Sequence, residues 1–424
     1  MHTIALLGAL DTKGVEYAFV QELLHRRGFR TLVIDVGVLG PPAITPDVTR
    51  NDVAAAAGED LEQLVAAGDR GRAMATMSRG AAMLVPQLHA AGRLDGILAL
   101  GGSGGSSVAC AAMRALPLGV PKVMVSTVAG GDVSGYVGVS DIVMVPSIVD
   151  VAGINRISRE VFSRAAGALC GMLETAVPPG DDRPLIAASM FGNTTQCVDA
   201  AKGVLEQAGY EVLVFHATGT GGRTMESLIA AGRITGVLDI TTTEWADQLV
   251  GGVLAAGTER LEAAARHGVP AVVAPGCLDM VNFWAPSTVP PALAARRFYP
   301  HNANVTLMRT TPDECQQLGK ILAEKLNLSQ GPVRLLLPLK GWSMIDAPGG
   351  PFWWPEANEA FRMAIKQHLR ADIPVLELDV NVNDPLFART AAENLLQLIS
   401  PAATPLQDRE ALRGSVITFG RGST

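Results

Sequence analysis

The stretch GILALGGSGGSS, residues 96–107, places a short apolar run directly before a loop of four glycines and three serines. Further short apolar runs, each followed by turn residues and a helical pattern, occur in the first half at residues 3–7, 31–35, 122–126 and 142–145. A repeated order of buried strand, loop and helix is typical of a parallel sheet with crossover helices. The sequence therefore predicts an α/β protein with mainly parallel sheets flanked by helices.

The length of the chain, 424 residues, is more than one ordinary core contains. Residues 178–184, PPGDDRP, gather prolines, a glycine and charges between two apolar runs, which is typical of a domain boundary. Strand patterns then resume near residues 185–189, 212–215, 237–240, 271–274, 305–308, 335–337 and 375–378. We predict two Rossmann-like domains, residues 1–179 and 185–400, followed by a loosely ordered polar tail at residues 401–424.

An internal repeat links the two halves. Residues 23–33 resemble residues 205–214, residues 90–98 resemble 230–238, and residues 119–125 resemble 268–273, in the same order along the chain. This suggests two similarly built halves, the first with an insertion between Asp35 and Arg93. The alternative is that helix–glycine–strand junctions resemble one another everywhere, because glycine suits the end of a helix.

Charge and composition exclude several classes of partner. The net charge is −7 and no basic stripe is present, which argues against nucleic-acid binding. No apolar run reaches the roughly 18 residues that span a bilayer, and no signal-peptide pattern opens the chain. The five cysteines, Cys110, Cys170, Cys197, Cys277 and Cys315, are scattered without a C-x-x-C motif. We expect a cytoplasmic protein without membrane or nucleic-acid partners.

The glycine-rich loop is the strongest candidate for ligand binding. It comprises Gly101, Gly102, Ser103, Gly104, Gly105 and Ser106. Glycines let the backbone approach a ligand closely, and the amide groups at the start of a helix favour an anion such as phosphate. The alternative is a tight strand-to-helix turn, which needs only one or two glycines.

Two further loops carry charged residues at strand ends. Lys13 can hold a phosphate, and Asp11 or Thr12 can support a hydrated magnesium ion, although the spacing is not that of a P-loop. The alternative is an ordinary helix N-cap with a solvated lysine. Asp35 ends a predicted strand, where nucleotide-binding folds often place a ribose-binding carboxylate; an exposed turn aspartate is the other interpretation.

Seven motifs together resemble the Tm-1-like ATP-binding family (UPF0261), which includes the N-terminal part of a tomato virus-resistance protein. They are GALDTKG (8–14), GGSGG (101–105), STVAGGDV (126–133), DVAGINRIS (150–158), PGCLDMVNFW (275–284), HNANVTLMRTT (301–311) and DAPGGPF (346–352). The resemblance, from residue 2 to residue 398, implies two Rossmann-like domains, ATP with Mg²⁺ in the N-terminal one, and a homodimer. By motif, it assigns nucleotide contacts to Asp11, Thr12, Lys13, the loop Gly101 to Ser106, Ser126, Thr127, Gly130, Gly131 and Asp132.

The second half concentrates reactive residue types. They are His216, Glu244, Asp247, Cys277, Asp279, His301, Asn302, Asn304, Arg309 and Asp346. A His216/Glu244 pair could transfer protons, and Cys277 could be a nucleophile beside His301. The alternatives are a buried apolar cysteine and a histidine that bonds a turn. Metal ligation by His216, Glu244 and His301 is conceivable, but no spacing matches a metal signature, so we predict no resident metal site there.

Three functions are compatible with these residues. The first is an ATP-using transferase, ligase or hydrolase acting on a small acidic or carbonyl-containing metabolite at the cleft between the domains. The second is a non-catalytic, nucleotide-dependent module that binds a protein. The third is an enzyme whose C-terminal site (Cys277, Glu244, His301) performs the chemistry while the nucleotide is only structural.

Overall fold

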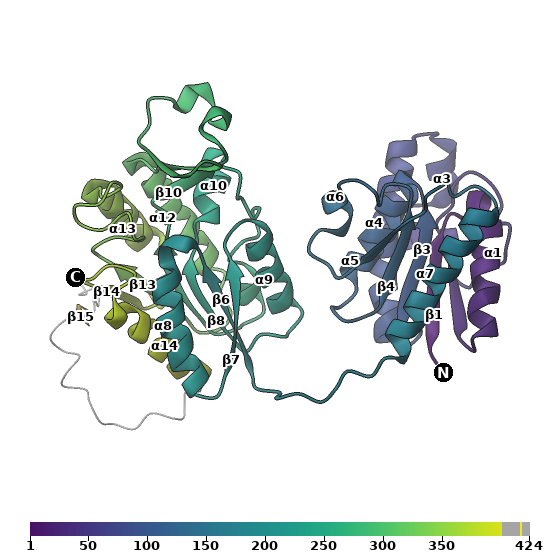
Figure 1. The fold of residues 1–424 in the computed structure, drawn as a ribbon, viewed down its shortest axis with the longest axis horizontal. Helices are drawn as coiled ribbons and strands as arrows, with labels where there is room; N and C mark the ends of the chain where they lie inside the picture. Colours follow the sequence, from purple (N-terminus) through teal and green to yellow (C-terminus); the bar gives the residue numbers. More distant parts are fainter. Residues whose placement is uncertain (401–415, 418–424) are drawn as a thin grey trace. The chain divides into compact units, whose positions relative to one another are not determined.

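The computed structural model describes residues 1–400 and 416–417. Apart from the short strand β15 (Val416–Ile417), the predicted loose tail lies outside the described residues. Internal contacts divide the chain into two compact units, Met1–Gly180 and Asp181–Thr424. Both are α/β units with a parallel sheet flanked by helices, as the sequence predicts (Figure 1).

The first unit contains a five-stranded parallel sheet in the order β2-β1-β3-β4-β5. Its strands are β1 (Thr3–Gly8), β2 (Arg30–Asp35), β3 (Gly96–Gly101), β4 (Lys122–Ser126) and β5 (Val143–Pro146). Its helices are α1 (Leu10–Arg26), α2 (Arg50–Ala56), α3 (Leu61–Ala66), α4 (Arg70–Ala90), α5 (Ser103–Ala115), α6 (Ser134–Val137) and α7 (Arg156–Glu174).

Alternate residues of β1 pack into two different cores, one on each face of this sheet. Ile4 and Leu6 belong to a core with residues of α1 and α7, whereas Ala5 and Leu7 belong to a core with residues of α4 and α5. Successive side chains of a strand point to opposite faces, and both faces are buried here. This explains why β1 is apolar without alternation.

Tyr17 of α1 completes the sheet where β1 and β3 end. Its fully buried hydroxyl accepts the N–H of Leu100 at 2.8 Å and donates to the carbonyl of Leu7 at 2.5 Å. A side chain at Gly8 would overlap the tyrosine ring, since an added Cβ would lie 2.2 Å from it. Glycine at this position therefore allows the aromatic ring to approach the backbone.

The second unit contains a seven-stranded sheet in the order β15-β14-β13-β9-β8-β6-β7, in which only β15 is antiparallel to its neighbour. The other strands are β6 (Leu185–Met190), β7 (Glu211–His216), β8 (Gly236–Thr241), β9 (Ala271–Gly276), β13 (Val333–Pro338) and β14 (Val375–Leu378). Its helices are α8 (Thr195–Gln207), α9 (Thr220–Ala230), α10 (Glu244–Val250), α11 (Ala263–Arg266), α12 (Pro312–Leu326), α13 (Pro355–His368) and α14 (Pro385–Ile399), with short 3-10 turns η1 (Gly192–Thr194), η2 (Pro286–Thr288) and η3 (Pro291–Leu293).

One predicted strand belongs to a different sheet. The 305–308 segment forms β12 (Val305–Arg309), the centre of a separate antiparallel sheet with β10 (Met280–Phe283) and β11 (Phe298–Asn302). Placing it with the parallel strands was wrong, because a short apolar run does not reveal the direction of its neighbours.

The strands matched by the internal repeat occupy equivalent positions in the two units. The order β7-β6-β8-β9-β13 repeats the order β2-β1-β3-β4-β5. Between β7 and β8 the chain forms α9 alone, whereas between β2 and β3 it forms α2, α3 and α4. The common order agrees with a repeated unit, and the extra helices lie where the insertion was predicted.

Two predicted loops are partly helical. Helix α1 begins at Leu10 rather than at residue 15, and its N-cap residue is Ala9, so the interpretation of Asp11 or Thr12 as the N-cap is wrong. Helix α5 begins at Ser103, with Gly102 as its N-cap residue. Asp11, Thr12 and Lys13 of α1 and Ser103, Gly104 and Gly105 of α5 therefore lie in first helical turns, where amide groups are unpaired. Gly101 instead ends β3, and Asp35 ends β2.

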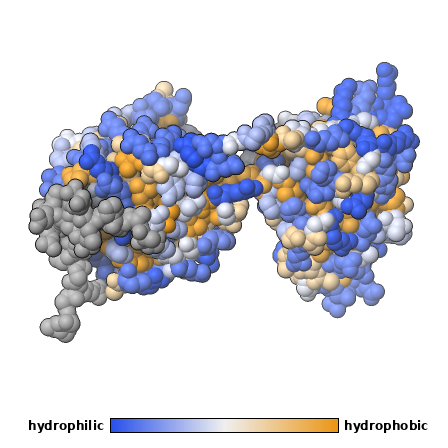
Figure 2. All heavy atoms as spheres, turned by 90° about the horizontal axis from the view of Figure 1, so that it is seen from below, coloured by the Kyte–Doolittle hydropathy of each residue, from blue (hydrophilic) through white to orange (hydrophobic). Residues whose placement is uncertain are grey.

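On the face drawn in Figure 2, hydrophilic and hydrophobic residues are interspersed on both units. In the part of the chain that the structure describes, no helix is both long and apolar enough to cross a membrane.

Candidate functional site

Three of the predicted nucleotide loops follow β1, β3 and β4, which are adjacent and parallel. The chain crosses from β1 to β2 on one side, and from β3 to β4 on the other, so the strand order reverses between β1 and β3. Ligands of open α/β sheets bind beyond the carboxyl ends of the strands at such a point. The topology therefore brings the Lys13 turn and the glycine loop to the same position on the sheet edge.

The glycine loop presents free backbone donors. The first N–H group of α5 that has a carbonyl partner is that of Ser106, which donates to the carbonyl of Gly102 at 2.9 Å. Among the described residues, the amides of Ser103, Gly104 and Gly105 have no such partner. The positive end of a helix dipole coincides with these donors, which favours an anionic ligand.

Part of the glycine content has a structural reason. A Cβ at Gly101 would lie 3.1 Å from the Cα of Gly105, and one at Gly104 would lie 3.3 Å from Met74. At Gly102 the nearest atom would be Thr127 Oγ1, at 3.6 Å, which is an ordinary contact. The tight-turn interpretation therefore accounts for some of these glycines. It leaves Gly102 unexplained, and also Gly105, where an added Cβ would lie 3.7 Å from the carbonyl oxygen of Leu100.

Two of the predicted contact residues are directed into the protein. Ser106 and Ser126 are fully buried, and their Oγ atoms lie 2.6 Å apart. Ser106 Oγ also donates to the carbonyl of Gly102 at 2.9 Å. These hydroxyls join the loop after β3 to the end of β4, whereas Ser103 is exposed and available to a ligand.

The loop after β4 lies beside the glycine loop. The N–H of Thr127 donates to the carbonyl of Gly101 at 3.2 Å. Gly130, Gly131 and Asp132 are exposed. Asp132 accepts the N–H of Ser134 at 2.9 Å, and this bond lowers the pKa of its carboxyl.

Asp11 in the first turn of α1 fixes the segment after β2. Its Oδ2 accepts the N–H groups of Leu39 at 2.7 Å and Gly40 at 3.2 Å. Its Oδ1 is buried without a partner in the described chain. Lys13, half-buried on the same turn, makes no hydrogen bond or ion pair with another described residue. The turn thus offers one ammonium group and one unpaired carboxylate oxygen.

Asp35 lies close to Asp11 and is fully buried, so the interpretation as an exposed turn residue is wrong. Its Oδ1 accepts the N–H groups of Leu10 at 3.1 Å and Gly37 at 2.9 Å. Its Oδ2 has no partner among the residues described. Burial raises the pKa of this carboxyl, two backbone hydrogen bonds oppose the rise, and the charge of Asp11 adds to it.

A cavity of about 570 Å³ opens in the second unit, at the carboxyl ends of β6 and β7 and against β10 and β11. Two predicted catalytic residues, His216 and His301, line it together with Arg223. No aspartate or glutamate belongs to its lining in the described chain. Aromatic groups of Phe191, Phe283 and Trp284 complete the wall.

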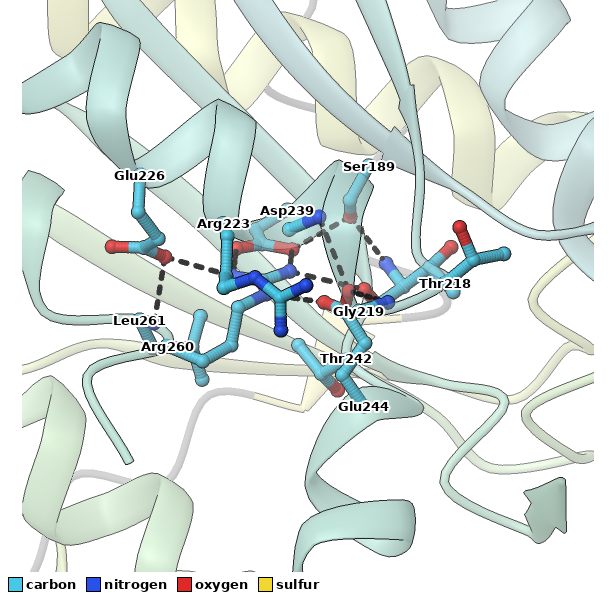
Figure 3. Close-up of polar contacts among 12 residues, drawn as sticks. Ser189, Thr218, Gly219, Arg223, Glu226, Asp239, Thr242, Glu244, Arg260 and Leu261 are labelled. Carbon is cyan, nitrogen blue, oxygen red and sulfur yellow. Dashed lines mark hydrogen bonds and ion pairs between the residues drawn. The ribbon is translucent and has the colours of Figure 1, made fainter. Parts of the chain in front are cut away.

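Glu244, predicted to be catalytic, lies behind this cavity rather than in it. Its Oε1 accepts the N–H groups of Gly219 at 2.7 Å and Gly222 at 3.1 Å, and its Oε2 accepts Arg260 Nε at 2.6 Å (Figure 3). Burial raises the pKa of Glu244, and Arg260 opposes the rise. The carboxylate therefore holds the start of α9 and occupies two of the amide donors there.

Arg260 connects Glu244 to two more acidic groups. It donates to Asp239 at 2.6 and 2.7 Å and to Glu226 at 3.1 Å (Figure 3). Arg260 as a whole is 2% exposed, so its guanidinium faces three carboxylates in the interior. Such a buried network stabilises one local arrangement, because a lost partner leaves an uncompensated charge.

Cys277 is fully buried at the end of β9 with a positive φ of 58°. It packs with Met280, Leu307 and Phe352, and burial raises the pKa of its thiol well above the usual value. A thiolate is disfavoured in this setting. The geometry favours the apolar interpretation of Cys277 over the nucleophile.

The sequence-based selection missed Arg223 and Asn282, which both line the cavity. Arg223 lies in the first turn of α9, shortly after the predicted strand at residues 212–215, so its position was a usable signal. Asn282 and Arg260 carried no signal, since their partners Asp247 and Glu244 are brought to them only by folding. No cluster of three or more His, Cys, Asp or Glu residues in the described chain is arranged to hold a metal ion.

The fold and the two sheet-edge sites define a two-unit α/β protein. Residues 2–178 match the N-terminal domain, and residues 183–399 the C-terminal domain, of the uncharacterised protein family UPF0261. A UPF0261 protein of Clostridium tetani is 49% identical over 398 residues, covering 93% of this chain and 98% of the relative. This chain belongs to the UPF0261 family.

More distant similarities extend to a plant protein and to solved structures. The ToMV resistance protein Tm-1(GCR237) of Solanum lycopersicum is 42% identical over 82% of this chain, which spans 47% of that protein. MurG of Acinetobacter baumannii aligns over 93% of this chain and 99% of its own, with 11% identity and a TM-score of 0.20.

Proposed function

We propose that this protein is an ATP-using enzyme that acts on a small acidic molecule. The observation that carries the proposal is the 570 Å³ cavity, whose charged or titratable lining residues, Arg223, His216 and His301, are all basic. An arginine binds carboxylate or phosphate through paired donors, and histidines transfer protons near neutral pH. Because an acceptor-only carbonyl group would also accept from Arg223, a carbonyl-containing substrate is the nearest variant of this proposal.

The first unit supports the nucleotide part of the proposal. The free amides of Ser103, Gly104 and Gly105 and the unpaired ammonium of Lys13 lie on adjacent strand ends at the reversal of strand order. Amide donors and a lysine are the groups that cradle phosphates in nucleotide-binding folds. Stabilisation of phosphate charge by these groups is what phosphoryl transfer requires.

Magnesium fits two residues of the same edge. Asp11 Oδ1 and Asp35 Oδ2 are buried carboxylate oxygens without partners among the described residues. Mg²⁺ is usually held through one or two carboxylates together with phosphate oxygens and water. Asp11 and Asp35 would hold the ion, which would neutralise charge on the phosphates.

The second candidate is a non-catalytic module that binds a protein in a nucleotide-dependent way. The observation in its favour is the 42% identity to a plant protein named for ToMV resistance. The third candidate, chemistry confined to the C-terminal unit, now depends on His216 and His301, since Glu244 and Cys277 are buried away from the cavity lining.

ATP consumption with a panel of small carboxylates and phosphate esters tests the proposal. We expect turnover with a subset of the acids, and loss of turnover in both Lys13→Ala and Arg223→Ala. ATP binding without turnover across the panel would favour the protein-binding module. Turnover that survives Lys13→Ala but not Arg223→Ala would favour the C-terminal site alone, and absence of ATP binding would reject the nucleotide site.

A further inference from the structure

We propose that the acid bound in the cavity is an aromatic acid, whose ring packs against the indole of Trp284 while its acid group binds Arg223. The assignment rests on the proposed function and specifies the chemical class of the substrate at the same site. Both residues line the cavity of about 570 Å³ in the second unit.

Trp284 differs from the other aromatic residues of the protein in its exposure. It is 50% exposed, and it is the only phenylalanine, tyrosine or tryptophan of the described chain that is exposed. The indole makes up most of the surface of a tryptophan, so half exposure of the residue leaves ring atoms accessible. An accessible aromatic ring in the wall of a cavity is typical of a site that buries an apolar part of a ligand.

The Trp284 indole has no partner for its ring or for its N–H group. Among the described residues, no aromatic ring or cation stacks on it, and its N–H donates no hydrogen bond. The backbone that leads to it is nevertheless fixed, because Trp284 directly follows β10, whose last residue Phe283 is paired with Thr306 of β12. The antiparallel sheet therefore holds an unpartnered aromatic ring at the cavity.

The other groups of the cavity favour an acid over a neutral aromatic molecule. Arg223 is exposed and forms no ion pair in the described chain. Its guanidinium donates only to the carbonyl of Ala255 at 3.4 Å and to Thr220 Oγ1 at 3.3 Å. The imidazoles of His216 and His301 are also exposed and make no hydrogen bond with another described residue. A cation without a counter-charge and an accessible ring in one cavity match a ligand with an acid group and a flat apolar part.

The volume of the cavity agrees with such a molecule. Pockets of about 300–1,000 Å³ bury most of a drug-sized ligand, whereas one water molecule occupies about 30 Å³ in the liquid. A short aliphatic acid would therefore leave much of the 570 Å³ filled with water and the Trp284 indole uncovered. An aromatic ring removes this apolar surface from water, which stabilises the complex in proportion to the area buried.

Matched pairs of acids test the proposal on the wild-type protein. Each pair is an aryl acid and its ring-saturated analogue: benzoate with cyclohexanecarboxylate, phenylacetate with cyclohexylacetate, and 3-phenylpropionate with 3-cyclohexylpropionate. The saturated ring is apolar but has no π-system, so each pair separates ring stacking from simple burial. In titration calorimetry, we expect at least one aryl acid to bind about two- to tenfold more tightly than its saturated partner.

Two further probes separate the ring from the acid group. Acetate has the acid without the ring, and benzyl alcohol has the ring without the acid; both should bind about tenfold or more weakly than the preferred aryl acid. Equal binding within every pair would reject the aromatic ring but leave the acidic substrate standing. Failure of every acid to bind would reject the anion site together with the ring. Benzyl alcohol that binds as tightly as the aryl acids would reject the anion site alone.

The variant Trp284→Leu tests the indole itself. Leucine keeps an apolar side chain without a π-system, so affinity should fall more for the aryl acid than for its saturated partner, and the preference should disappear. The matched control is Trp353→Leu, since Trp353 is half-buried and lies outside the cavity lining. The control should keep the preference. A preference that survives in Trp284→Leu, or that is lost in both variants, would show that the indole of Trp284 does not hold the ring.

Discussion

Arg260 Nε lies 2.6 Å from Glu244 Oε2, while the other oxygen of the same carboxylate accepts the amides that open α9. A residue selected from sequence as a proton carrier is thus a buried support for the loop that lines the cavity. Because α9 also bears Arg223, the Glu244–Arg260 pair fixes the position of the proposed anion-binding group.

Replacing Glu244 with alanine should strongly destabilise the second unit. The substitution leaves Arg260 with less counter-charge and the amides of Gly219 and Gly222 without an acceptor. Breaking such a buried pair lowers the free energy of unfolding by about 3–5 kcal/mol. Urea unfolding measures the loss. Glu206→Ala, which removes an exposed partner of Lys202 on α8, is the control and should change the free energy of unfolding by less than about 1 kcal/mol. Similar losses for both would contradict the assigned role.

Stability should fall as the pH rises toward neutrality. Burial, with the nearby charge of Asp346, raises the pKa of Asp279 to about 7. The pKa of an aspartate in the unfolded chain is about 3.9. Between these values the native state binds more protons than the unfolded state, so the free energy of unfolding decreases by up to about 1.4 kcal/mol per pH unit per group. The contribution of Asp279 to the free energy of unfolding should become constant above pH 7. Unfolding measured from pH 4 to pH 8 tests this.

Asp279→Asn separates this residue from the others that titrate in the same window, such as Asp247. The variant should be more stable relative to wild type at pH 8 than at pH 5, because its side chain is always neutral. The control is Asp199→Asn on the exposed side of α8. An unchanged pH slope in Asp279→Asn would show that Asp279 is ionised throughout.

Lys13→Ala should weaken ATP binding. The ammonium has no partner in the described chain, so its removal costs the fold little while removing a phosphate contact worth about tenfold or more in affinity. Calorimetric titration with ATP and Mg²⁺ measures the change. Arg26→Ala, at the other end of α1 and paired with Glu22, should leave the affinity unchanged. Equal affinity in Lys13→Ala and wild type would remove Lys13 from the site.

Arg223→Ala should weaken binding of acids to the second unit by about tenfold or more, since a charge-assisted contact is lost. The ATP binding that we propose for the first unit should be unchanged. Arg233→Ala, which removes an exposed arginine just beyond the far end of α9, is the matched control. The assignment of Arg223 would fail if both variants bound the acids equally well.

The fold was predictable because its signals are local. Apolar runs such as residues 96–101 and the glycines after them appear in consecutive residues, and the repeat between the halves indicated the common strand order. The candidate site was only partly predictable. His216 and His301 do line one cavity, but the chemistry expected of Glu244 and Cys277 depends on exposure, which a strand-end position does not reveal.

By itself, the sequence determined the α/β class, the glycine loop and the family, because each depends on residues that are contiguous in the chain. Only the tertiary structure decided that Arg260 neutralises Glu244, that Asp247 orients Asn282, and that Asp11 and Asp35 each keep an unpaired oxygen. The physical reason is that burial and hydrogen-bond partners are set by residues far apart in the chain, and these determine which polar groups are already satisfied and which can take a ligand.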